Sequence, residues 1–223
     1  MVEPVVIVGA GLSGLTSAYV LWQHNIPSLI LEARDRIGGR IFTERSDSFH
    51  TEMGATWLGP QHTVLISLLE QLEVTKFVQS YDGKSIVDYG PSHPPYFFSS
   101  NPGDPPTYRI VNGSATLIDH LLKVSSPKLS LGSEVKSIKY LGDTVLIITD
   151  EDQFEAEFLV NTIPPKLTRR SISFEPELND DVLKKMEETH TWMSNSIKFS
   201  VRYKEPFWRS QGLSGCIMSQ GGA

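Results

Sequence analysis

Three glycines near the N-terminus constrain this chain more than any other feature. Gly9, Gly11 and Gly14 form a G-x-G-x-x-G pattern directly after an apolar run, residues 5–8. Apolar residues then recur at helical spacing, and a second apolar run follows at residues 28–31. A strand, a glycine-rich turn, a helix and a second strand form a β-α-β unit, and this context makes the glycine pattern a specific signal. The sequence therefore predicts a parallel α/β sheet at the N-terminus.

Each glycine has a mechanical role in binding a dinucleotide. The first permits a tight turn, the second lets a pyrophosphate approach the backbone, and the third lets helix and strand pack closely. The start of the helix, at Leu12 and Ser13, supplies N–H groups and a positive dipole. Glu32 lies 18 residues after Gly14, near the distance expected for the acid that binds the adenosine ribose. A carboxylate there disfavours a 2′-phosphate, so NADP is the poorest candidate.

Composition limits the remaining classes of function. The 223 residues include 20 Lys plus Arg and 26 Asp plus Glu, and the formal charge of −6 excludes a basic nucleic-acid footprint. A single cysteine, Cys216, excludes an internal disulfide and a cysteine-based zinc site, and the histidines lack ligand spacing, so no metal is expected. No apolar stretch reaches 18 residues and the N-terminus lacks a basic leader. We therefore expect a cytoplasmic protein without membrane binding.

The rest of the chain predicts short helices and strands. Apolar residues at helical spacing indicate three further helices, near residues 64–72, 115–122 and 178–186. Two β-rich runs, residues 135–141 and 144–149, predict a hairpin around Gly142 and Asp143. Residues 197–203 predict another strand. Residues 90–106 hold six of the 14 prolines and predict a loop or linker.

The segment after the second strand resembles the flavin-dependent amine oxidase family, and reads Glu32-Ala33-Arg34-Asp35-Arg36-Ile37-Gly38-Gly39-Arg40. The resemblance implies that Arg40 lies beside the pyrophosphate of FAD and Arg34 beside its adenosine end. Paired glycines let the chain pass close to an extended cofactor, and a guanidinium can hold phosphate oxygens bidentately. By residue type alone, a lone arginine is more often a solvated surface group. The resemblance makes six residues cofactor-binding: Glu32, Ala33, Arg34, Gly38, Gly39 and Arg40.

Three further segments resemble the same family. Gly54-Ala55-Thr56-Trp57 matches the stretch whose backbone contacts the isoalloxazine ring, although Trp57 alone would be interpreted as core filling. Val135 matches a valine whose backbone binds adenine, although by pattern alone it is the first residue of a strand. Residues 160–165 resemble the strand and turn that re-enter the FAD-binding domain. Together with the glycine pattern, these segments imply FAD.

Lys198 takes the position of the family's active-site lysine, within residues 197–209. The resemblance implies that its side chain reaches the flavin N5 through a water and takes part in reoxidation by oxygen. A buried lysine suits this role because desolvation disfavours the charged ammonium. The alternation of apolar and polar residues around Lys198 also fits an ordinary strand with one wet face. Lys198 is therefore a candidate catalytic residue.

The resemblance implies an α/β fold with a Rossmann-type FAD-binding domain and a smaller α+β substrate domain, incomplete relative to the family. Residues 1–80 and 128–170 are expected to form the FAD-binding domain, and residues 81–127 and 171–223 a partial substrate domain. The implied reaction oxidises the C–N bond of a small-molecule amine by hydride transfer to flavin N5, with oxygen as the final acceptor. Cys216 does not match a flavin-linking cysteine, so FAD is expected to be non-covalent.

Two segments of the family have no counterpart. A long helical insert normally lies between Tyr81 and Arg109, where this chain has only the proline-rich stretch, and the last FAD-binding segment normally follows Trp208. An alternative therefore stays open: a truncated, catalytically incompetent FAD-binding module, or half of a split oxidase. The missing elements should leave an open sheet edge and an apolar patch, which favours self-association or a complementing chain.

Overall fold

The structure is a computed structural model that describes residues 2–46, 49–101 and 103–220. The chain divides into two compact units, a large unit of Met1–Ala55 with Asn112–Lys198 and a small unit of Thr56–Val111 with Phe199–Ala223. The chain therefore passes between the units three times. The expected division into FAD-binding and substrate domains stays a prediction, because compactness does not show what a unit binds.

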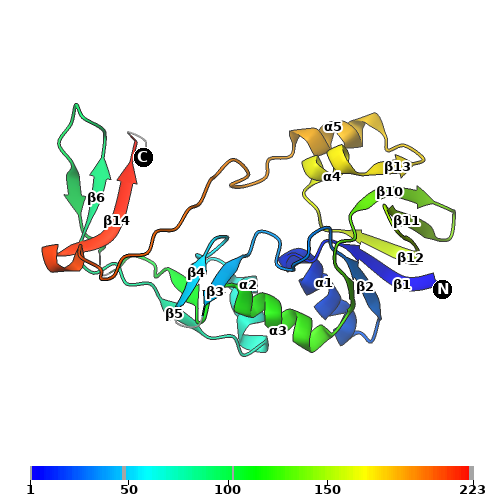
Figure 1. Ribbon diagram of the computed structural model, residues 1–223, viewed down its shortest axis with the longest axis horizontal. Coiled ribbons are helices and arrows are strands. Elements are labelled where there is room, and N and C mark those ends of the chain that lie inside the picture. Colours follow the sequence, from blue (N-terminus) through cyan, green and yellow to red (C-terminus); the bar gives the residue numbers. More distant parts are fainter. Residues whose placement is uncertain (1, 47–48, 102, 221–223) are drawn as a thin grey trace. The chain divides into compact units, whose positions relative to one another are not determined.

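A seven-stranded sheet forms the centre of the large unit (Figure 1). Its strands are β1 (Val2–Val8), β2 (Ser28–Leu31), β9 (Lys128–Ser130), β10 (Val135–Tyr140), β11 (Val145–Thr149), β12 (Gln153–Asn161) and β13 (Ser173–Glu175). The order is β13-β10-β11-β12-β1-β2-β9, with β12, β1, β2 and β9 parallel. A separate antiparallel hairpin pairs β3 (Thr43–Ser46) with β4 (Phe49–Glu52). The predicted α/β class and the parallel sheet at the N-terminus are confirmed.

Residues 5–8 of β1 are apolar and buried, because both faces of the strand are covered there. Val6 and Val8 belong to a buried cluster with residues of β2, β10, β11 and β12. Successive side chains of a strand point to opposite faces, so Val5 and Ile7 face the other way. The helix α1 (Leu12–Gln23) contacts β1 and β2, and α3 (Ala115–Ser125) packs against α1. The predicted helices after Gly11 and near residue 115 are therefore confirmed.

The predicted hairpin is also confirmed, since β10 and β11 pair antiparallel and Leu141 donates its N–H to the carbonyl oxygen of Thr144 at 2.9 Å. Beyond β12, the helices α4 (Pro165–Ser171) and α5 (Asp180–Glu188) lie side by side. Glu187 of α5 forms ion pairs with Lys166 and Arg170 of α4. The hydrogen bond from Lys166 lowers the pKa of the Glu187 carboxyl.

The small unit contains one α-helix in the described part of the chain, α2 (Thr63–Gln71), and this confirms the helix predicted near residues 64–72. β5 (Lys76–Val78) pairs antiparallel with β8 (Tyr108–Ile110). A three-stranded sheet has the order β14-β6-β7, where β6 is Lys84–Asp88, β7 is Tyr96–Phe98 and β14 is Leu213–Ser219. A short 3-10 turn, η1 (Arg209–Gln211), precedes β14. Across both units, no helix of the described ranges has the length and apolarity to cross a membrane.

Two sequence predictions were wrong. Residues 197–203 were expected to form a strand, but they contribute to no sheet of the described chain, and Ile197 is 92% exposed. Alternating apolar residues become a strand only where a neighbouring strand pairs with their backbone and one face is covered. Residues 90–106 were expected to be a loop, yet they contain β7, which pairs with β6. Pro102, in the same stretch, lies outside the described residues.

Leu69 offers a test of the core of the small unit, because it is 1% exposed on α2. Leu69→Ala should lower the free energy of unfolding by roughly 2–5 kcal/mol, since it leaves a cavity. Val64, 84% exposed on the same helix, provides the control, and Val64→Ala should change that free energy by less than about 0.5 kcal/mol. Urea unfolding followed by circular dichroism measures both. Equal losses in the two variants would contradict the observed orientation of α2.

Candidate functional site

The turn between β1 and α1 is closed by contacts that favour glycine. Gly9 has a φ of +102° and donates its N–H to the carbonyl oxygen of Leu31, in β2, at 2.8 Å. A Cβ on Gly14 would collide with the carbonyl oxygen of Gly9, so glycine is required where α1 passes this close to the strand. The turn thus has the tight bend and the close approach of helix to strand that dinucleotide-binding turns use.

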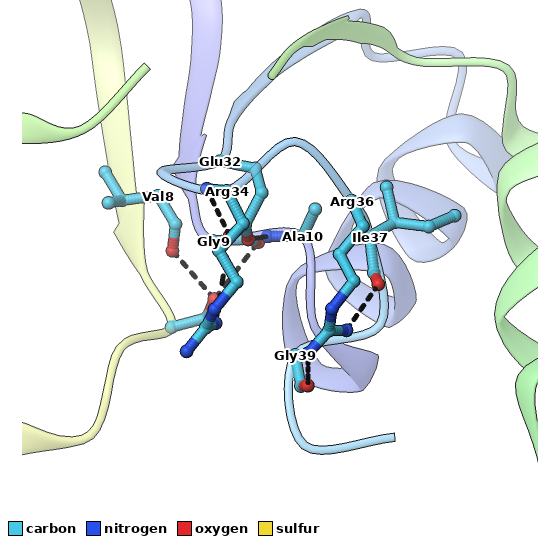
Figure 2. A network of polar contacts seen from close by, with 9 residues as sticks. Val8, Gly9, Ala10, Glu32, Arg34, Arg36, Ile37 and Gly39 are labelled. Atoms are coloured by element: carbon cyan, nitrogen blue, oxygen red, sulfur yellow. Dashed lines mark hydrogen bonds and ion pairs between the residues drawn. The ribbon is translucent and has the colours of Figure 1, made fainter. Parts of the chain in front are cut away.

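Glu32 lies directly after β2, and its carboxylate faces this turn (Figure 2). Oε2 accepts the backbone N–H of Ala10 at 2.8 Å, and Oε1 accepts that of Arg34 at 3.0 Å. Glu32 is only 5% exposed, and a buried carboxylate needs hydrogen-bond donors to offset its lost hydration. The two N–H groups therefore fix the carboxylate against the turn. Its two oxygens together can accept further hydrogen bonds.

Gly11 and the start of α1 present a surface that a pyrophosphate can approach. Within 4 Å, a Cβ on Gly11 would meet only the Cα of Gly39, at 3.9 Å. Gly11 is the N-cap of α1 and provides no side-chain cap, so the N–H groups of the first turn can bind an anion. Leu12 is half-buried and Ser13 is exposed at this point. The residues present fit the diphosphate of a dinucleotide cofactor.

A second glycine loop, residues 36–40, lies against the first glycine turn, residues 9–14. Gly38 donates its N–H to the carbonyl oxygen of Ala10 at 2.8 Å and forms a parallel bridge with Gly11. Gly38 and Gly39 have φ values of +97° and +57°, and a Cβ on Gly39 would lie 3.2 Å from the Cα of Gly11. These glycines allow two backbone segments to touch where a side chain would separate them. The two glycine patterns are therefore parts of one structure.

Arg36 holds the second loop in shape. Its guanidinium donates to the carbonyl oxygens of Ile37 at 3.1 Å and Gly39 at 3.2 Å, as Figure 2 shows. It also lies over the ring of Phe42, 4.5 Å from the centroid. The sequence motif contains Arg36 but indicates no role for it, since its partners are visible only in the folded loop. The nearby cofactor candidates Ala33, Arg34 and Arg40 are exposed.

Residues 53–55, which we call the Gly54 segment, lie beside the end of the second glycine loop. Met53 and Gly54 donate their N–H groups to the carbonyl oxygen of Phe42 at 2.8 and 3.2 Å, and Ala55 donates to that of Arg40 at 3.0 Å. Lys198 donates from Nζ to the carbonyl oxygen of Gly54 at 2.8 Å. The structure thus brings Lys198 to the Gly54 segment across 144 positions of sequence. Lys198 is exposed, so the burial expected for this lysine is not found.

Val135 begins β10 and is buried, close in sequence to a loop that contacts the turn after β2. In that loop, Ser133 donates its N–H to the carbonyl oxygen of Glu32 at 2.8 Å, and Gly132 donates to that of Arg34 at 2.9 Å. The start of β10 is therefore anchored beside the segment 32–34. No pattern in the sequence indicated this anchoring, because it joins residues about 100 positions apart.

Two candidates belong to the other unit. The boundary falls between Ala55 and Thr56, so Thr56 and Trp57 are part of the small unit. Thr56 is buried, whereas Trp57 is 56% exposed. The guanidinium of Arg109 lies over the Trp57 ring, 5.4 Å from its centroid, in a cation–π contact. Trp57 is therefore not core filling, which was the alternative interpretation. The remaining candidates from Gly9 to Ala55, with Val135 and Lys198, lie in the large unit.

Thr162 is a contact of the turn that sequence reasoning missed. Its hydroxyl donates to the carbonyl oxygen of Val8 at 2.7 Å. The hydroxyl oxygen of Thr162 also lies 2.8 Å from where a Cβ on Gly9 would sit. Thr162 follows β12 and is 154 residues from Val8, so local patterns carry no signal for the contact. The threonine closes the back of the glycine turn.

A family model described as flavin containing amine oxidoreductase matches residues 12–105 and 96–222. The two matches cover nearly the whole chain. The chain belongs to the flavin-containing amine oxidoreductase family. The matches overlap at residues 96–105, inside the proline-rich stretch where the sequence predicted that the family's helical insert is missing.

Relatives within the flavin-containing amine oxidoreductase family are considerably longer. Flavin-containing amine oxidase B of Canis lupus familiaris is 23% identical over 316 residues, covering 97% of this chain and 60% of the relative. Flavin-containing amine oxidase A of Sus scrofa is 23% identical over 313 residues, covering 96% of this chain and 59% of the relative. The chain thus spans about 60% of the length of these curated relatives.

Solved structures share the fold. Putrescine oxidase bound to putrescine superposes with a TM-score of 0.82 at 20% identity, covering 98% of this chain and 70% of that one. Cyclohexylamine oxidase from Brevibacterium oxydans gives the same TM-score and coverage at 16% identity. The predicted membership of the flavin-dependent amine oxidases is therefore confirmed, together with the fold and its incompleteness relative to these proteins.

Gly11 separates ligand binding from folding, because an alanine there fits the structure. If the diphosphate binds at this turn, Gly11→Ala should lower the affinity for ADP about tenfold or more, since the new Cβ would lie where the pyrophosphate is expected to approach. It should cost at most about 1 kcal/mol of stability, because alanine is a poorer N-cap than glycine. Calorimetric titration and thermal unfolding measure the two effects. Gly103→Ala, where a Cβ would meet nothing within 4 Å, is the control. Unchanged ADP binding by Gly11→Ala would contradict the expectation that the diphosphate binds at this position.

Proposed function

We propose that this chain binds FAD non-covalently and contributes the cofactor site of an amine-oxidising flavoenzyme. The observation that carries the proposal is the joining of the two glycine loops, at the Gly11–Gly38 bridge, beside the buried carboxylate of Glu32. Family membership supports a flavin rather than a nicotinamide dinucleotide. The substrate would be a small-molecule amine, with oxygen as the electron acceptor.

The large unit has groups suited to each part of the ADP half of FAD. N–H groups at the start of α1 would bind the diphosphate, with help from the helix dipole. The carboxylate of Glu32 has lone pairs left for ribose hydroxyls after its bonds to Ala10 and Arg34. Exposed Arg40 would add charge beside the phosphates, and the backbone of Val135 would bind adenine. Each assignment follows the family resemblance.

The flavin end would involve the Gly54 segment of the large unit. For Thr56 and Trp57, which belong to the small unit, a flavin contact stays an expectation from the family resemblance. Bound FAD would supply the acceptor for the hydride lost by the amine, which no side chain of the protein can provide. Lys198 would hold a water beside the flavin and move a proton there. Its Nζ is already fixed to the Gly54 carbonyl oxygen at 2.8 Å, on the segment proposed to contact the flavin. This contact is the main support for a role of Lys198.

A second candidate function is an FAD-binding module without turnover, or one half of a split oxidase. It is favoured by the coverage, since the chain spans only about 60% of the relatives' length. The missing segments include those that the family resemblance connects with the substrate. Self-association or a complementing chain would then be needed for activity. The cytoplasmic location expected from the sequence stays a prediction in both cases.

Flavin uptake tests the proposal directly. After incubation with FAD and desalting, the purified protein should show the visible absorption of oxidised flavin and should release the flavin fully on denaturation. ADP should compete for the site. 2′,5′-ADP should compete at least about tenfold more weakly than AMP, from which it differs only by the 2′-phosphate that Glu32 would repel. A colourless protein that takes up no added FAD would contradict the proposal, and flavin that stays attached after denaturation would contradict non-covalent binding.

Lys198→Met tests the catalytic part. The variant should keep its FAD and release hydrogen peroxide from an amine roughly 10²–10⁴-fold more slowly, as expected for the loss of a proton-transfer group. Lys204→Met, which removes another exposed lysine six residues later, serves as the control and should match the unmodified protein. If Lys198→Met released hydrogen peroxide as fast as the unmodified protein, the proposed proton-transfer role of Lys198 would be excluded. FAD uptake without any turnover by the unmodified chain would favour the module.

A further inference from the structure

Glu52 is a buried charged residue that the proposed function does not use. It ends β4 and is 7% exposed. Its Oε1 accepts the backbone N–H of Ser114 at 2.6 Å, and its Oε2 accepts the hydroxyl of Thr43 at 3.1 Å. The Thr43 oxygen in turn accepts the N–H of Ala115 at 3.0 Å. We call these four residues the Glu52 cap.

The Glu52 cap closes the N-terminus of α3 from outside the helix. Ser114 is the N-cap residue of α3, but its own side chain makes no capping bond. A carboxylate near the positive end of a helix is favourable, and here it comes from the β3–β4 hairpin, 62 residues earlier. Gly113 has a φ of +92°, and a Cβ on it would collide with the side chain of Thr43. The hairpin and the helix are therefore fitted closely together.

The Gly54 segment follows Glu52 directly. On its other side it is hydrogen-bonded to Arg40 and Phe42, and a Cβ on Gly54 would collide with the carbonyl oxygen of Arg40. The segment thus lies between the Glu52 cap and the second glycine loop. α3 packs against α1, and α1 begins at the first glycine turn. Contacts within the large unit therefore connect the Glu52 cap to the first glycine turn through these two helices.

We propose that Glu52 is a positioning residue, which fixes the Gly54 segment relative to the first glycine turn and thereby sets where the isoalloxazine ring of FAD lies. This inference rests on the proposed function for the identity of the ligand. Glu52 itself bonds to an N–H group and a hydroxyl of the chain. It acts on the cofactor through the backbone of the Gly54 segment. A residue that merely stabilised the domain would affect both halves of FAD equally, whereas this one affects the flavin half selectively.

The test compares Glu52→Gln with Glu44→Gln, since Glu44 is an exposed glutamate on the same hairpin. Thr43→Val, which removes the hydroxyl and keeps the carboxylate, is measured beside them, so the test stands on two variants of the Glu52 cap. Three quantities are measured: the affinity for ADP, the affinity for FAD with the fluorescence of the bound flavin, and the amide hydrogen exchange of residues 53–55. The last needs no cofactor.

We expect Glu52→Gln and Thr43→Val to keep the ADP affinity within about twofold and to weaken FAD binding about tenfold, with altered flavin fluorescence, because one buried charge-assisted bond is weakened or lost. Amide exchange at residues 53–55 should accelerate, and Glu44→Gln should match the unmodified protein. Unchanged FAD binding and exchange would overturn the inference. Equal losses for ADP and FAD would also overturn it, by showing a general effect on stability. If the unmodified protein takes up no FAD, the proposed function fails, whereas unchanged amide exchange in the two cap variants would by itself contradict the positioning role of Glu52.

Discussion

The hydrogen bond between the Glu32 carboxylate and the N–H of Ala10 is the interaction on which the candidate site depends. It joins the end of β2 to the turn that opens α1, and both oxygens of the buried carboxylate are held by backbone donors. Because the second glycine loop begins a few residues after Glu32 and touches Gly11, the position of that loop also follows from this bond. A side chain that we propose for ligand recognition therefore also organises the backbone of the protein itself.

Several segments of the candidate site are joined by backbone contacts. The bonds from Met53 and Gly54 to Phe42, from Ser133 to Glu32, and from Gly38 to Ala10 all use N–H and C=O groups. Backbone groups are the same whatever the side chain, so such an arrangement tolerates wide sequence change provided that glycine remains where segments touch. Such an arrangement is compatible with a TM-score of 0.82 at only 20% identity with putrescine oxidase.

Much of the large unit could be predicted from the sequence because its signals are local. The apolar run of β1, the glycine turn and the helical spacing after it lie within about 20 residues, and the hairpin at Gly142 is shorter still. The strand expected at residues 197–203 failed because a strand depends on a partner that the local pattern does not contain. The contacts of Thr162 and Glu52 were missed because their partners are 154 and 62 residues away. The exposure of Lys198 also depends on what covers it, which its neighbours in sequence do not determine.

The place of β1 in the sheet has a consequence for synthesis on the ribosome. β1 lies between β2 and β12, so one edge can pair as soon as residue 31 has emerged, but the other must wait for residues 153–161. At about 5–20 residues per second, the roughly 130 residues between these points take about 6 to 26 seconds. During this time an apolar strand has an open edge, and the nascent chain depends on chaperones or on β2 and α1 alone to keep it from pairing elsewhere.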